Sequence, residues 1–572
     1  MPRNTLANIS VCIVVAFIAG ACAASVDDSV TSDELKRDAG TTRSFDPAVS
    51  TTVTINANLI VEGTLRMRPN AGVTHTLRFT GANNAACVGG GMVPIASDVG
   101  LWVMGAGKLD VQGAQKTGWA RPTSGLLAGA STIAFGSLPA GWVVGDELVI
   151  VPTRAGDTTG FETRTVMGVS GGTVTLNSPL TLDHPKVGSS APEVANLTRT
   201  VRIEGTPTGY THVFIHNHVP AVHTVKHAAL RYVGVRNNAD TICLGRYPLH
   251  FHMGDANNVG SVVDGVVVRQ SGARGIVQHA THGTVAQPLT ITDAVLYDIQ
   301  EDAMWWDPGD ENASEHILWD RILAARVWSP MVGSQQLQLA AFKLHHGAID
   351  FGDEVRDSVA VGVQGSRFAA GFLWPEHEQA VWRFDRGNVS HNNLHHGFRI
   401  WHNGHELHDV GGFTLYHNGD TGIHHGAYAN VYVFHDATLI GDGTDTAFLD
   451  LAVSALGTTG QRQSLVNATI DNFAVGMYVG EHNSAIAASA PVLVKNVAMT
   501  RTPRPVIIDD IGVQRSLVDF CNVTVDGAAL GPAHLTFQDF HTGSVFRIQS
   551  AAGSARQWTS AGGWQSIPSF CP

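Results

Sequence analysis

Gly397-Phe398-Arg399-Ile400 and Gly422-Ile423-His424-His425 carry the pattern that decides the fold of this chain. In each stretch, a small residue is followed at once by a bulky apolar residue, and the side chains after it are expected to alternate in and out of a core. The same frame fits seven stretches, whose small residues are Gly275, Ala303, Gly371, Gly397, Gly422, Ala447 and Gly476. Neighbouring copies are roughly 25 to 29 residues apart, except across one wide gap after Ala303. This period indicates a solenoid, in which each unit buries its apolar edge by stacking on the next.

The positions around the frame also favour β structure. Five residues before each small residue stands a polar residue, such as Gln270, Asp298 or Asn392. Short polar side chains suit the corners between strands, where they cap turn backbone. Glycine counts 62 and charged residues only 15%, which favours a turn-dense β protein over a helical one. We therefore predict an all-β chain folded as a right-handed parallel β-helix.

Three successive segments place chemically active side chains on the outer wall of this β-helix. The segments are Pro248-Leu249-His250-Phe251-His252, Gly275-Ile276-Val277-Gln278-His279 and Ala303-Met304-Trp305-Trp306-Asp307. The first position after each small residue is apolar and faces the core, so the second and fourth positions should face solvent. Stacked in register at about 4.8 Å, His252, His279 and Asp307 form one outward column, with His250 and Trp305 in a second column beside it.

Two imidazoles and a carboxylate on one face suit a divalent transition metal, or an acid/base pair in which the carboxylate orients an imidazole. We predict His252, His279 and Asp307 as metal ligands, and His250, His279, His282 and Asp307 as catalytic residues. A stacked histidine ladder without any ligand is the alternative. A carboxylate pair of the glycosidase kind, drawn from Asp302, Asp307 and Asp310, is a further one, although the pattern does not single out two of them.

Four more residues are predicted to bind a substrate on the same face. Arg246 and Arg399 would hold carboxylates of an acidic polysaccharide, and Trp305 would stack on a sugar ring. Arg399 and His424 occupy the second outward position in later copies and extend the face. The net charge of −13 argues against nonspecific binding of nucleic acid, because there is no excess of cations to release phosphate counterions.

The N-terminus is predicted to be an export signal over residues 1–24. Arg3 precedes an apolar run from about Ile9 to Ala21 that is too short for a comfortable membrane span. Ala19-Gly20-Ala21-Cys22 resembles a bacterial lipobox, in which Cys22 would carry a lipid anchor; cleavage after Ala21-Cys22-Ala23 is the alternative. The protein is therefore expected to be an outer-membrane lipoprotein or extracellular, with a possible lipid anchor as its sole attachment to a membrane.

The rest of the chain divides by composition. Residues 25–50 are polar and acidic and indicate a flexible tether. Short β segments broken by glycine indicate a β-sandwich-like module over 51–195. The β-helix is expected over 196–500, with an insertion near 308–360 that could form a lid over the site. A β cap is expected over 501–572.

Four cysteines remain after the export signal, and export makes disulfides feasible. They are Cys87, Cys243, Cys521 and Cys571, which allow three pairings. We prefer Cys521 with Cys571, which would tie down the C-terminal segment. None has the close spacing of a zinc–cysteine site.

Several motifs resemble one known family. Leu101-Trp102-Val103-Met104-Gly105-Ala106-Gly107-Lys108-Leu109-Asp110-Val111-Gln112-Gly113, with Trp142-Val143-Val144-Gly145-Asp146-Glu147, resembles the eight-glycine domain of the cell-migration-inducing, hyaluronan-binding protein family and of fibrocystin-like proteins. Gly245-Arg246-Tyr247-Pro248-Leu249-His250-Phe251-His252 is similar to that family's Arg-Tyr-Pro-hydrophobic-His-Phe-His signature. His279-Ala280-Thr281-His282-Gly283 resembles its His-Gly-Thr-His-Gly, with Ala280 in place of a glycine.

The resemblance implies an extracellular β-helix and, in some members, calcium-dependent cleavage of hyaluronan. The family's further domains are not recognisable in this chain, which looks like a bacterial export product, so hyaluronan specificity is not carried over. We predict a secreted or surface-anchored enzyme that cleaves an acidic, hyaluronan-like polysaccharide, as a hydrolase or a lyase, with calcium or a transition metal as a candidate cofactor. A noncatalytic carbohydrate-binding or adhesion protein is the main alternative, and a purely structural surface protein is a third.

Overall fold

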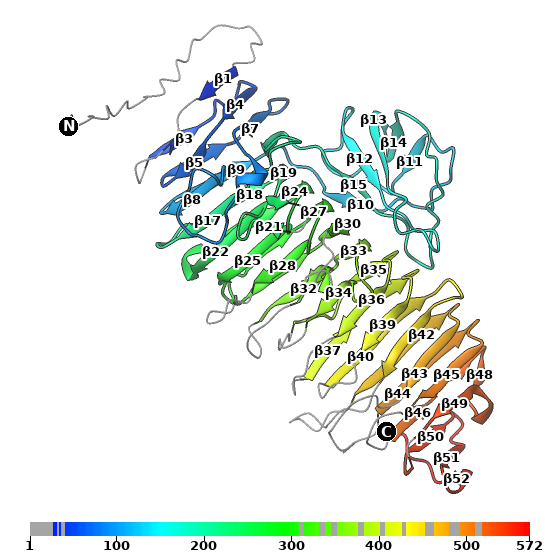
Figure 1. The fold of residues 1–572 in the computed structure, drawn as a ribbon. Helices are drawn as coiled ribbons and strands as arrows, with labels where there is room; N and C mark the ends of the chain where they lie inside the picture. The colour runs from blue at the N-terminus through cyan, green and yellow to red at the C-terminus, as the bar shows by residue number, and fades with distance from the viewer. Residues whose placement is uncertain are drawn as a thin grey trace, which may run out of the picture.

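The computed structural model of the chain describes residues 27–30, 34–35, 41–238, 241–307, 314–330, 338–344, 352–375, 382–400, 407–425, 431–451, 463–479, 492–509, 517–540 and 542–572. Their strands wind into a long parallel β-helix, and a small antiparallel unit stands beside it (Figure 1). The predicted all-β parallel β-helix is confirmed. The export signal predicted over 1–24, with Cys22, lies outside the described residues. No helix in the described part of the chain is long and apolar enough to cross a bilayer.

Three sheets form the walls of the β-helix, and sheet B carries the repeat frame. The strands of sheet B are β2 (Glu34–Leu35), β5 (Asn58–Val61), β8 (Leu101–Gly105), β17 (Val213–Asn217), β22 (Leu249–Asp255), β25 (Ile276–Thr281), β28 (Met304–Asp307), β31 (Ala340–Lys343), β34 (Ala370–Trp374), β36 (His396–Ile400), β39 (Thr421–His425), β41 (Thr446–Leu451), β43 (Val475–Val479), β45 (Arg504–Asp509) and β49 (Leu535–Asp539). Sheet C contains β3 (Thr42–Ser44), β6 (Thr64–Met67), β9 (Lys108–Gln112), β18 (Thr224–Lys226), β23 (Val262–Asp264), β26 (Leu289–Thr292), β29 (Ile317–Asp320) and β32 (Glu354–Arg356).

Sheet A is the longest of the three. Its strands are β1 (Asp27–Val30), β4 (Thr51–Ile55), β7 (His75–Phe79), β16 (Val201–Glu204), β19 (Ala228–Val233), β24 (Val267–Ser271), β27 (Val295–Ile299), β30 (Leu323–Trp328), β33 (Val359–Gln364), β35 (Val389–His391), β37 (Leu407–Gly411), β38 (Thr414–Tyr416), β40 (Val431–Ile440), β42 (Ser464–Asp471), β44 (Val492–Thr500), β46 (Leu517–Cys521), β47 (Thr524–Val525), β48 (Ala528–Ala529), β50 (Val545–Gln549), β51 (Ala555–Thr559) and β52 (Gly563–Ile567).

The inward positions of sheet B stack into one continuous core. Ile276, Met304, Phe342, Phe372 and Phe398 are successive register partners, and each side chain is fully buried. Burying a side chain of this size contributes about 1.5–3 kcal/mol, which explains why an apolar residue follows the small one in every copy. Phe342 fills the wide gap in the sequence frame, so the insertion predicted near 308–360 contains one further coil.

The polar corner positions adopt backbone that most residues avoid. Gln270, Asp298, Asn392 and His417 have φ between 49° and 63°, which is the left-handed region. Asparagine and aspartate tolerate this region better than most non-glycine residues because their short side chains bond locally to backbone. The corner interpretation of the sequence frame is therefore correct at these four positions.

The module predicted over 51–195 needs a correction. Strands β4 to β9 already belong to the three walls of the β-helix, and the stretch from Leu101 to Gly113 forms β8 and β9 in parallel register with β17 and β18. The separate unit is a six-stranded antiparallel sheet, inserted between β9 and β16. Its strands are β10 (Trp119–Ala120), β11 (Thr132–Ala134), β12 (Glu147–Ile150), β13 (Glu162–Ser170), β14 (Thr173–Leu176) and β15 (Val194–Asn196). The alternation of Leu101 and Val103, whose register partners are Val213 and Ile215, explains the reassignment.

This antiparallel unit is fixed to sheet A. Trp119 and Leu197 pack with Val295 and Leu323 in a buried apolar cluster. The indole Nε1 of Trp119 also donates to a β-helix carbonyl, that of Arg321, at 2.8 Å. These contacts place the antiparallel unit on sheet A and its corners, whereas the predicted site lies on sheet B.

Both ends of the β-helix also differ from the prediction. The tether expected over 25–50 contributes β1, β2 and β3, which pair in parallel with β4, β5 and β6. The cap expected from 501 begins with further coils, since β45 and β46 still pair in parallel with earlier strands, and only β50, β51 and β52 form an antiparallel meander at the end. A bare terminal coil would expose unpaired strand edges, which both segments cover. The Cys521–Cys571 disulfide, as we preferred, ties the last residues to β46.

Candidate metal centre

The centre lies on sheet B where β17, β22, β25 and β28 run side by side. His252 pairs in register with His279, and His279 pairs with Asp307. His250 pairs with Val277, which pairs in turn with Trp305. The two columns predicted from the sequence are therefore present in the backbone.

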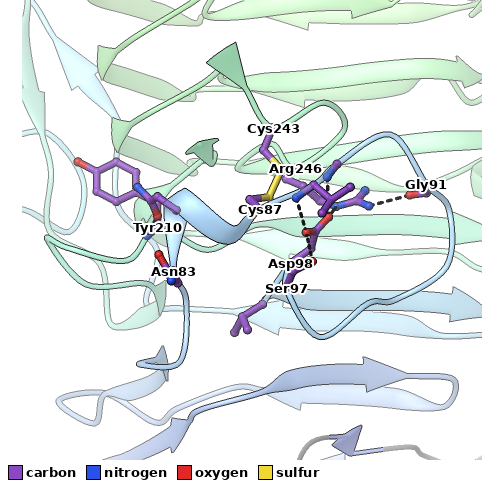
Figure 2. The surroundings of a disulfide bond; sticks show 12 residues. Asn83, Cys87, Gly91, Ser97, Asp98, Tyr210, Cys243 and Arg246 are labelled. Atoms are coloured by element: carbon purple, nitrogen blue, oxygen red, sulfur yellow. Dashed lines mark hydrogen bonds and ion pairs between the residues drawn. A yellow bond between two sulfur atoms is a disulfide. The ribbon is translucent and has the colours of Figure 1, made fainter. Parts of the chain in front are cut away.

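The loop that leads into β22 is anchored to a distant segment. Cys243 forms a disulfide with Cys87, and the guanidinium of Arg246 forms an ion pair with Asp98 at 2.8 Å (Figure 2). Asp98 also accepts hydrogen bonds from two backbone N–H groups near Cys87, which hold its carboxylate in place. These two links fix residues 243–246 immediately before the histidines. Because the sulfur atoms of Cys87 and Cys243 are bonded to each other, they are not metal ligands.

Three histidines converge beyond this anchor. The ligand nitrogens of His250, His252 and His279 all lie within 4.8 Å of one another. The ring centroids of His250 and His252 are 4.9 Å apart, and those of His252 and His279 are 4.7 Å apart. Nitrogens around a tetrahedral zinc ion, with Zn–N distances of 2.0–2.1 Å, are about 3.4 Å apart. A small closure of the rings would therefore bring all three into ligating positions.

Hydrogen bonding sets the tautomer of His250. Its Nδ1 lies 2.9 Å from the carbonyl oxygen of Gly245, and a carbonyl only accepts, so Nδ1 carries the proton. The Nε2 atom of His250 is then left with a lone pair, and in the part of the chain that the structure describes it is buried without a hydrogen-bond partner. The same holds for the Nδ1 atom of His252. Histidines that bind a metal through one ring nitrogen commonly donate from the other to a backbone carbonyl, which fixes the tautomer in this way.

Burial keeps two of these imidazoles neutral. Burial lowers the pKa of His250 well below its usual range, and the neighbouring His252 lowers it further. Burial first, and His279 second, lower the pKa of His252 to about 3. Metal ligation needs the deprotonated imidazole, so no proton has to be removed from His250 or His252 near neutral pH.

The donor set selects the kind of metal. Three imidazole nitrogens suit zinc, copper, nickel or iron, whereas calcium takes six to eight oxygen ligands. The histidine cluster therefore fits a divalent transition metal and does not fit calcium. Asp307 follows His279 in register, but its side chain lies outside the described residues.

We predicted that the second outward column faces solvent, but in the structure it is covered. Val277 and Trp305 form a small apolar cluster with Ile242 and Tyr247, which lie in the loop before β22 that includes the short strand β21 (Thr241–Ile242). The guanidinium of Arg274 lies 3.3 Å from the ring centroid of Trp305. The sugar-stacking role predicted for Trp305 is therefore wrong, because its ring is covered by this loop and by Arg274.

Both arginines predicted to hold substrate carboxylates are buried. Arg246 forms its ion pair with Asp98, where both side chains are fully buried, and its guanidinium stacks on Trp102. Arg399 is also buried, with its guanidinium 4.1 Å from the ring centroid of Phe368. A substrate carboxylate cannot reach either group in this arrangement, so both predicted roles are corrected.

Two predicted histidines lie apart from the cluster. His282 follows the end of β25 and is not among the three converging residues. His424 lies on β39, five strands along sheet B from β25, where its Nδ1 is 3.4 Å from Nε2 of His396. Asp302, a carboxylate of the alternative glycosidase pair, is buried and 3.2 Å from Nζ of Lys343, and Asp310 lies outside the described residues.

One functional neighbour was missed. His216 donates from Nδ1 to the carbonyl oxygen of His252 at 2.9 Å, and its ring packs 5.5 Å from that of His252. The exposed His218 packs against His216 with ring centroids 4.3 Å apart. The sequence does contain a signal for His216, because Phe214-Ile215-His216 aligns with His250-Phe251-His252. The segments compared above start at Pro248, so they leave out the earlier coil that carries His216.

Comparison with known proteins supports a likeness over the same region. The family model described as CEMIP beta-helix matches residues 216–317, a segment that contains all three converging histidines and His216. Fibrocystin-L of Mus musculus is 26% identical over 245 residues, and that of Homo sapiens is 26% identical over 222 residues. These matches cover 34% and 30% of this chain, and 6% and 5% of the relatives' own lengths.

Solved structures with a likeness to the chain include three phage tailspikes. They are the Pseudomonas phage phi297 tailspike gp61 (10% identity, 87% of this chain, 74% of that chain, TM-score 0.22), the Pseudomonas phage LKA1 tailspike gp49 (13%, 88%, 71%, 0.18) and the Gp54 tailspike of Acinetobacter baumannii bacteriophage AP22 in complex with A. baumannii capsular saccharide (10%, 89%, 77%, 0.22). TM-scores this low support no inference from those proteins to this one.

Proposed function

We propose that this chain is an exported, metal-dependent enzyme that cleaves a polysaccharide at the His250–His252–His279 centre. The observation that carries the proposal is the convergence of three ligand nitrogens within 4.8 Å, with Nε2 of His250 and Nδ1 of His252 buried and without hydrogen-bond partners among the described residues. Unpartnered buried polar atoms cost stability, so such a cluster needs a compensating role. A bound metal supplies that role.

The glycan substrate class comes from the family resemblance. The CEMIP beta-helix match covers the segment with the Arg-Tyr-Pro-Leu-His-Phe-His motif, and the resemblance at that motif implies glycan cleavage. The burial of Arg246 and Arg399 removes the cations that we expected to neutralise an acidic glycan. If uronates are bound, the metal itself would supply positive charge for them at the centre.

The histidines at the centre have different roles in this proposal. His250, His252 and His279 would hold the metal, and the hydrogen bond from Nδ1 of His250 to the carbonyl of Gly245 leaves its Nε2 as the ligand atom. A metal on three imidazoles keeps an open coordination position, where it can polarise a substrate oxygen or lower the pKa of a bound water. His216 supports His252 through the backbone. The exposed His218 stands nearest to solvent in the same array and is our candidate for proton transfer.

Two disulfides, Cys87–Cys243 and Cys521–Cys571, suit an exported protein, since such bonds persist in oxidising compartments. The export signal over residues 1–24 supports the same location, either extracellular or anchored through Cys22. We include export in the proposal on these two grounds.

Metal stoichiometry of the purified chain tests the centre, and turnover tests the function. We expect one transition-metal ion per chain by elemental analysis, and polysaccharide depolymerisation that is lost on chelation and restored by the metal. The His279→Ala variant should lose both, whereas His435→Ala, a change at a histidine on β40 of sheet A and outside the cluster, should keep both.

A noncatalytic glycan-binding protein gives a different result. It would bind polysaccharide without cleaving it, and His279→Ala would then alter binding while the parent shows no turnover with any metal. A parent chain that binds no metal, with zinc, copper, nickel and iron each supplied in turn, would overturn the metal centre itself.

A further inference from the structure

A hollow of about 610 Å³ opens on sheet B well away from the histidine cluster. Its walls come from β36, β39 and β41, from the corners before β39 and β41, and from the turn before β34. The residues that line it are Arg367, Phe368, His396, Gly419, Asp420, Thr421, His424, Thr444, Asp445, Thr446 and Leu449. All of them lie in the described part of the chain. From β25 to β39 are five strand steps, which is about 24 Å at 4.8 Å per step.

Asp445 is the unusual member of this wall. Its side chain is only 4% exposed, and its Oδ2 atom is buried without a hydrogen-bond partner among the described residues. The other oxygen accepts a long hydrogen bond from the backbone N–H of Asp442, at 3.3 Å. Burial, and then the charge of Asp442, raise the pKa of Asp445 to about 7. A carboxyl that holds its proton at pH 6 offers both a hydrogen-bond donor and an acceptor.

The surroundings of Asp445 supply more hydrogen-bonding groups. Nε2 of His396 lies 2.8 Å from the carbonyl of Arg367, so it donates there, and Nδ1 then accepts from the hydroxyl of Thr421. Thr444 and Thr446 add hydroxyls, while Phe368 and Leu449 add apolar surface. Hydroxyl-lined walls with one apolar side fit a sugar ring, which has polar edges and apolar faces.

Other ligand classes fit less well. In the described residues, no three metal-ligating groups of this hollow converge as those of the histidine cluster do. An anion would meet Asp420, whose carboxylate is paired with His395 at 2.6 Å, and the charge of the nearby Asp442. The one cationic side chain in the wall, Arg367, has its guanidinium over the ring of Phe368. The hollow therefore suits an uncharged, hydroxylated ligand.

We propose that this hollow is a carbohydrate-binding site that accepts one uncharged sugar residue, with Asp445 donating and accepting hydrogen bonds to its hydroxyls. The site is separate from the metal centre and does not depend on the proposed cleavage. An extended glycan on sheet B would need several sugar residues to span the two sites.

Binding of the full chain to an array of neutral and uronate-containing oligosaccharides tests the site. We expect neutral glycans to be bound at pH 6, and about tenfold more weakly at pH 8, because the protonated fraction of a group with a pKa near 7 falls about tenfold over this interval. The other titratable and charged groups that line the hollow are Arg367, His396, Asp420 and His424, and the charge of Asp442 acts on Asp445 from nearby. Comparison with a variant that cannot ionise at position 445 isolates the part of the change that Asp445 causes.

Two variants localise the binding. Asp445→Asn keeps a donor and an acceptor but cannot ionise, so its binding should be the same at pH 6 and pH 8. Thr444→Trp places a large side chain at the exposed rim, where folding should be unaffected, and should abolish binding. Asp436→Asn, a change of the same kind at an exposed carboxylate outside the hollow, should behave as the parent.

His279→Ala should leave this binding intact, which separates the site from the metal centre. Binding that survives Thr444→Trp, a preference for uronates over neutral glycans, or no binding of any neutral glycan would each overturn the proposal. Loss of metal from the parent would bear on the proposed function alone.

Discussion

Two histidine-bearing regions on the same sheet have different chemistry. At β22 and β25, His250 donates to a backbone carbonyl through Nδ1 and keeps Nε2 for a ligand. At β36 and β39, both ring nitrogens of His396 are engaged, by Thr421 and by the carbonyl of Arg367. Both regions carry neighbouring imidazoles, and His424 lies in the same register column as His250. The difference shows that register brings histidines together, while their hydrogen-bond partners decide whether they can bind a metal.

The two regions also differ in how they are held. A buried ion pair and a disulfide connect the loop before β22 to residues 87–98, far away in the sequence. The hollow at β36 to β41 is held by contacts between neighbouring coils, such as the hydrogen bond from the side chain of Asn393 to that of Asn418. We therefore expect changes outside the repeat to affect the first region more strongly than the second.

The largest effect should follow removal of the buried cation. In Arg246→Ala, Asp98 would remain buried without its partner, which typically costs about 3–5 kcal/mol. The free energy of unfolding, measured from urea denaturation, should fall by this amount. Arg68→Ala, which removes a half-exposed partner of Asp110, should cost about 0–1 kcal/mol. Equal losses in the two variants would contradict an anchoring role for the buried pair.

The fold and much of the centre could be predicted from the sequence because coil length is nearly constant on sheet B. Residues at the same offset from Gly275 and Ala303 then meet as register partners, as His279 and Asp307 do. What covers the outward positions was not predictable in this way. Ile242 and Tyr247 belong to a loop outside the repeat, so nothing in the frame indicates that they bury Val277 and Trp305.

The ion pair of Arg246 with Asp98 could not be predicted from the sequence for a similar reason. Asp98 lies in an earlier coil, and no local pattern connects the two residues. An arginine beside a histidine motif was therefore interpreted as a substrate ligand when it anchors the loop. Wherever a motif lies next to an irregular loop, the fold decides whether its charged side chains face the substrate or the interior.

The next largest effect should come from removing one metal ligand. Structural zinc in small proteins is bound with about 10–16 kcal/mol, so one of three or four ligands contributes about 3–4 kcal/mol, or several hundred-fold in affinity. His279→Ala should weaken zinc or cobalt binding by this factor in a competitive titration. His396→Ala, in the second region, should leave the metal affinity unchanged, and a similar loss there would show that the two regions are not distinct in metal binding.

In the second region, the stability of the fold should depend on pH through Asp445. Its folded pKa of about 7 is raised above the ordinary value of 3.8, so the folded state holds a proton that the unfolded chain releases between about pH 4 and 7. Stability should therefore fall as the pH rises through this window and level off above it. Asp445→Asn lacks this loss. The difference in free energy of unfolding between the variant and the parent should therefore shift in favour of the variant by about 2–4 kcal/mol from pH 4 to pH 8.

Urea denaturation at a series of pH values measures this difference. Asp436→Asn is the control, since an exposed carboxylate with a lowered pKa gives no such gain at high pH. A parent and an Asp445→Asn variant whose stabilities change in parallel from pH 4 to pH 8 would contradict a buried, protonated Asp445.

The smallest effect should be the most specific to the first region. Cys243 stands two residues before Gly245, whose carbonyl fixes the tautomer of His250. Replacing Cys87 and Cys243 by serine should loosen that carbonyl and weaken metal binding about tenfold, as other changes to the partners of metal-bound histidines do. The matched control removes Cys521 and Cys571, which lie near the C-terminal meander, and should leave the metal affinity unchanged. If both pairs of substitutions weaken the metal equally, the effect is general destabilisation. If neither does, the buried Asp98–Arg246 pair holds the loop unaided.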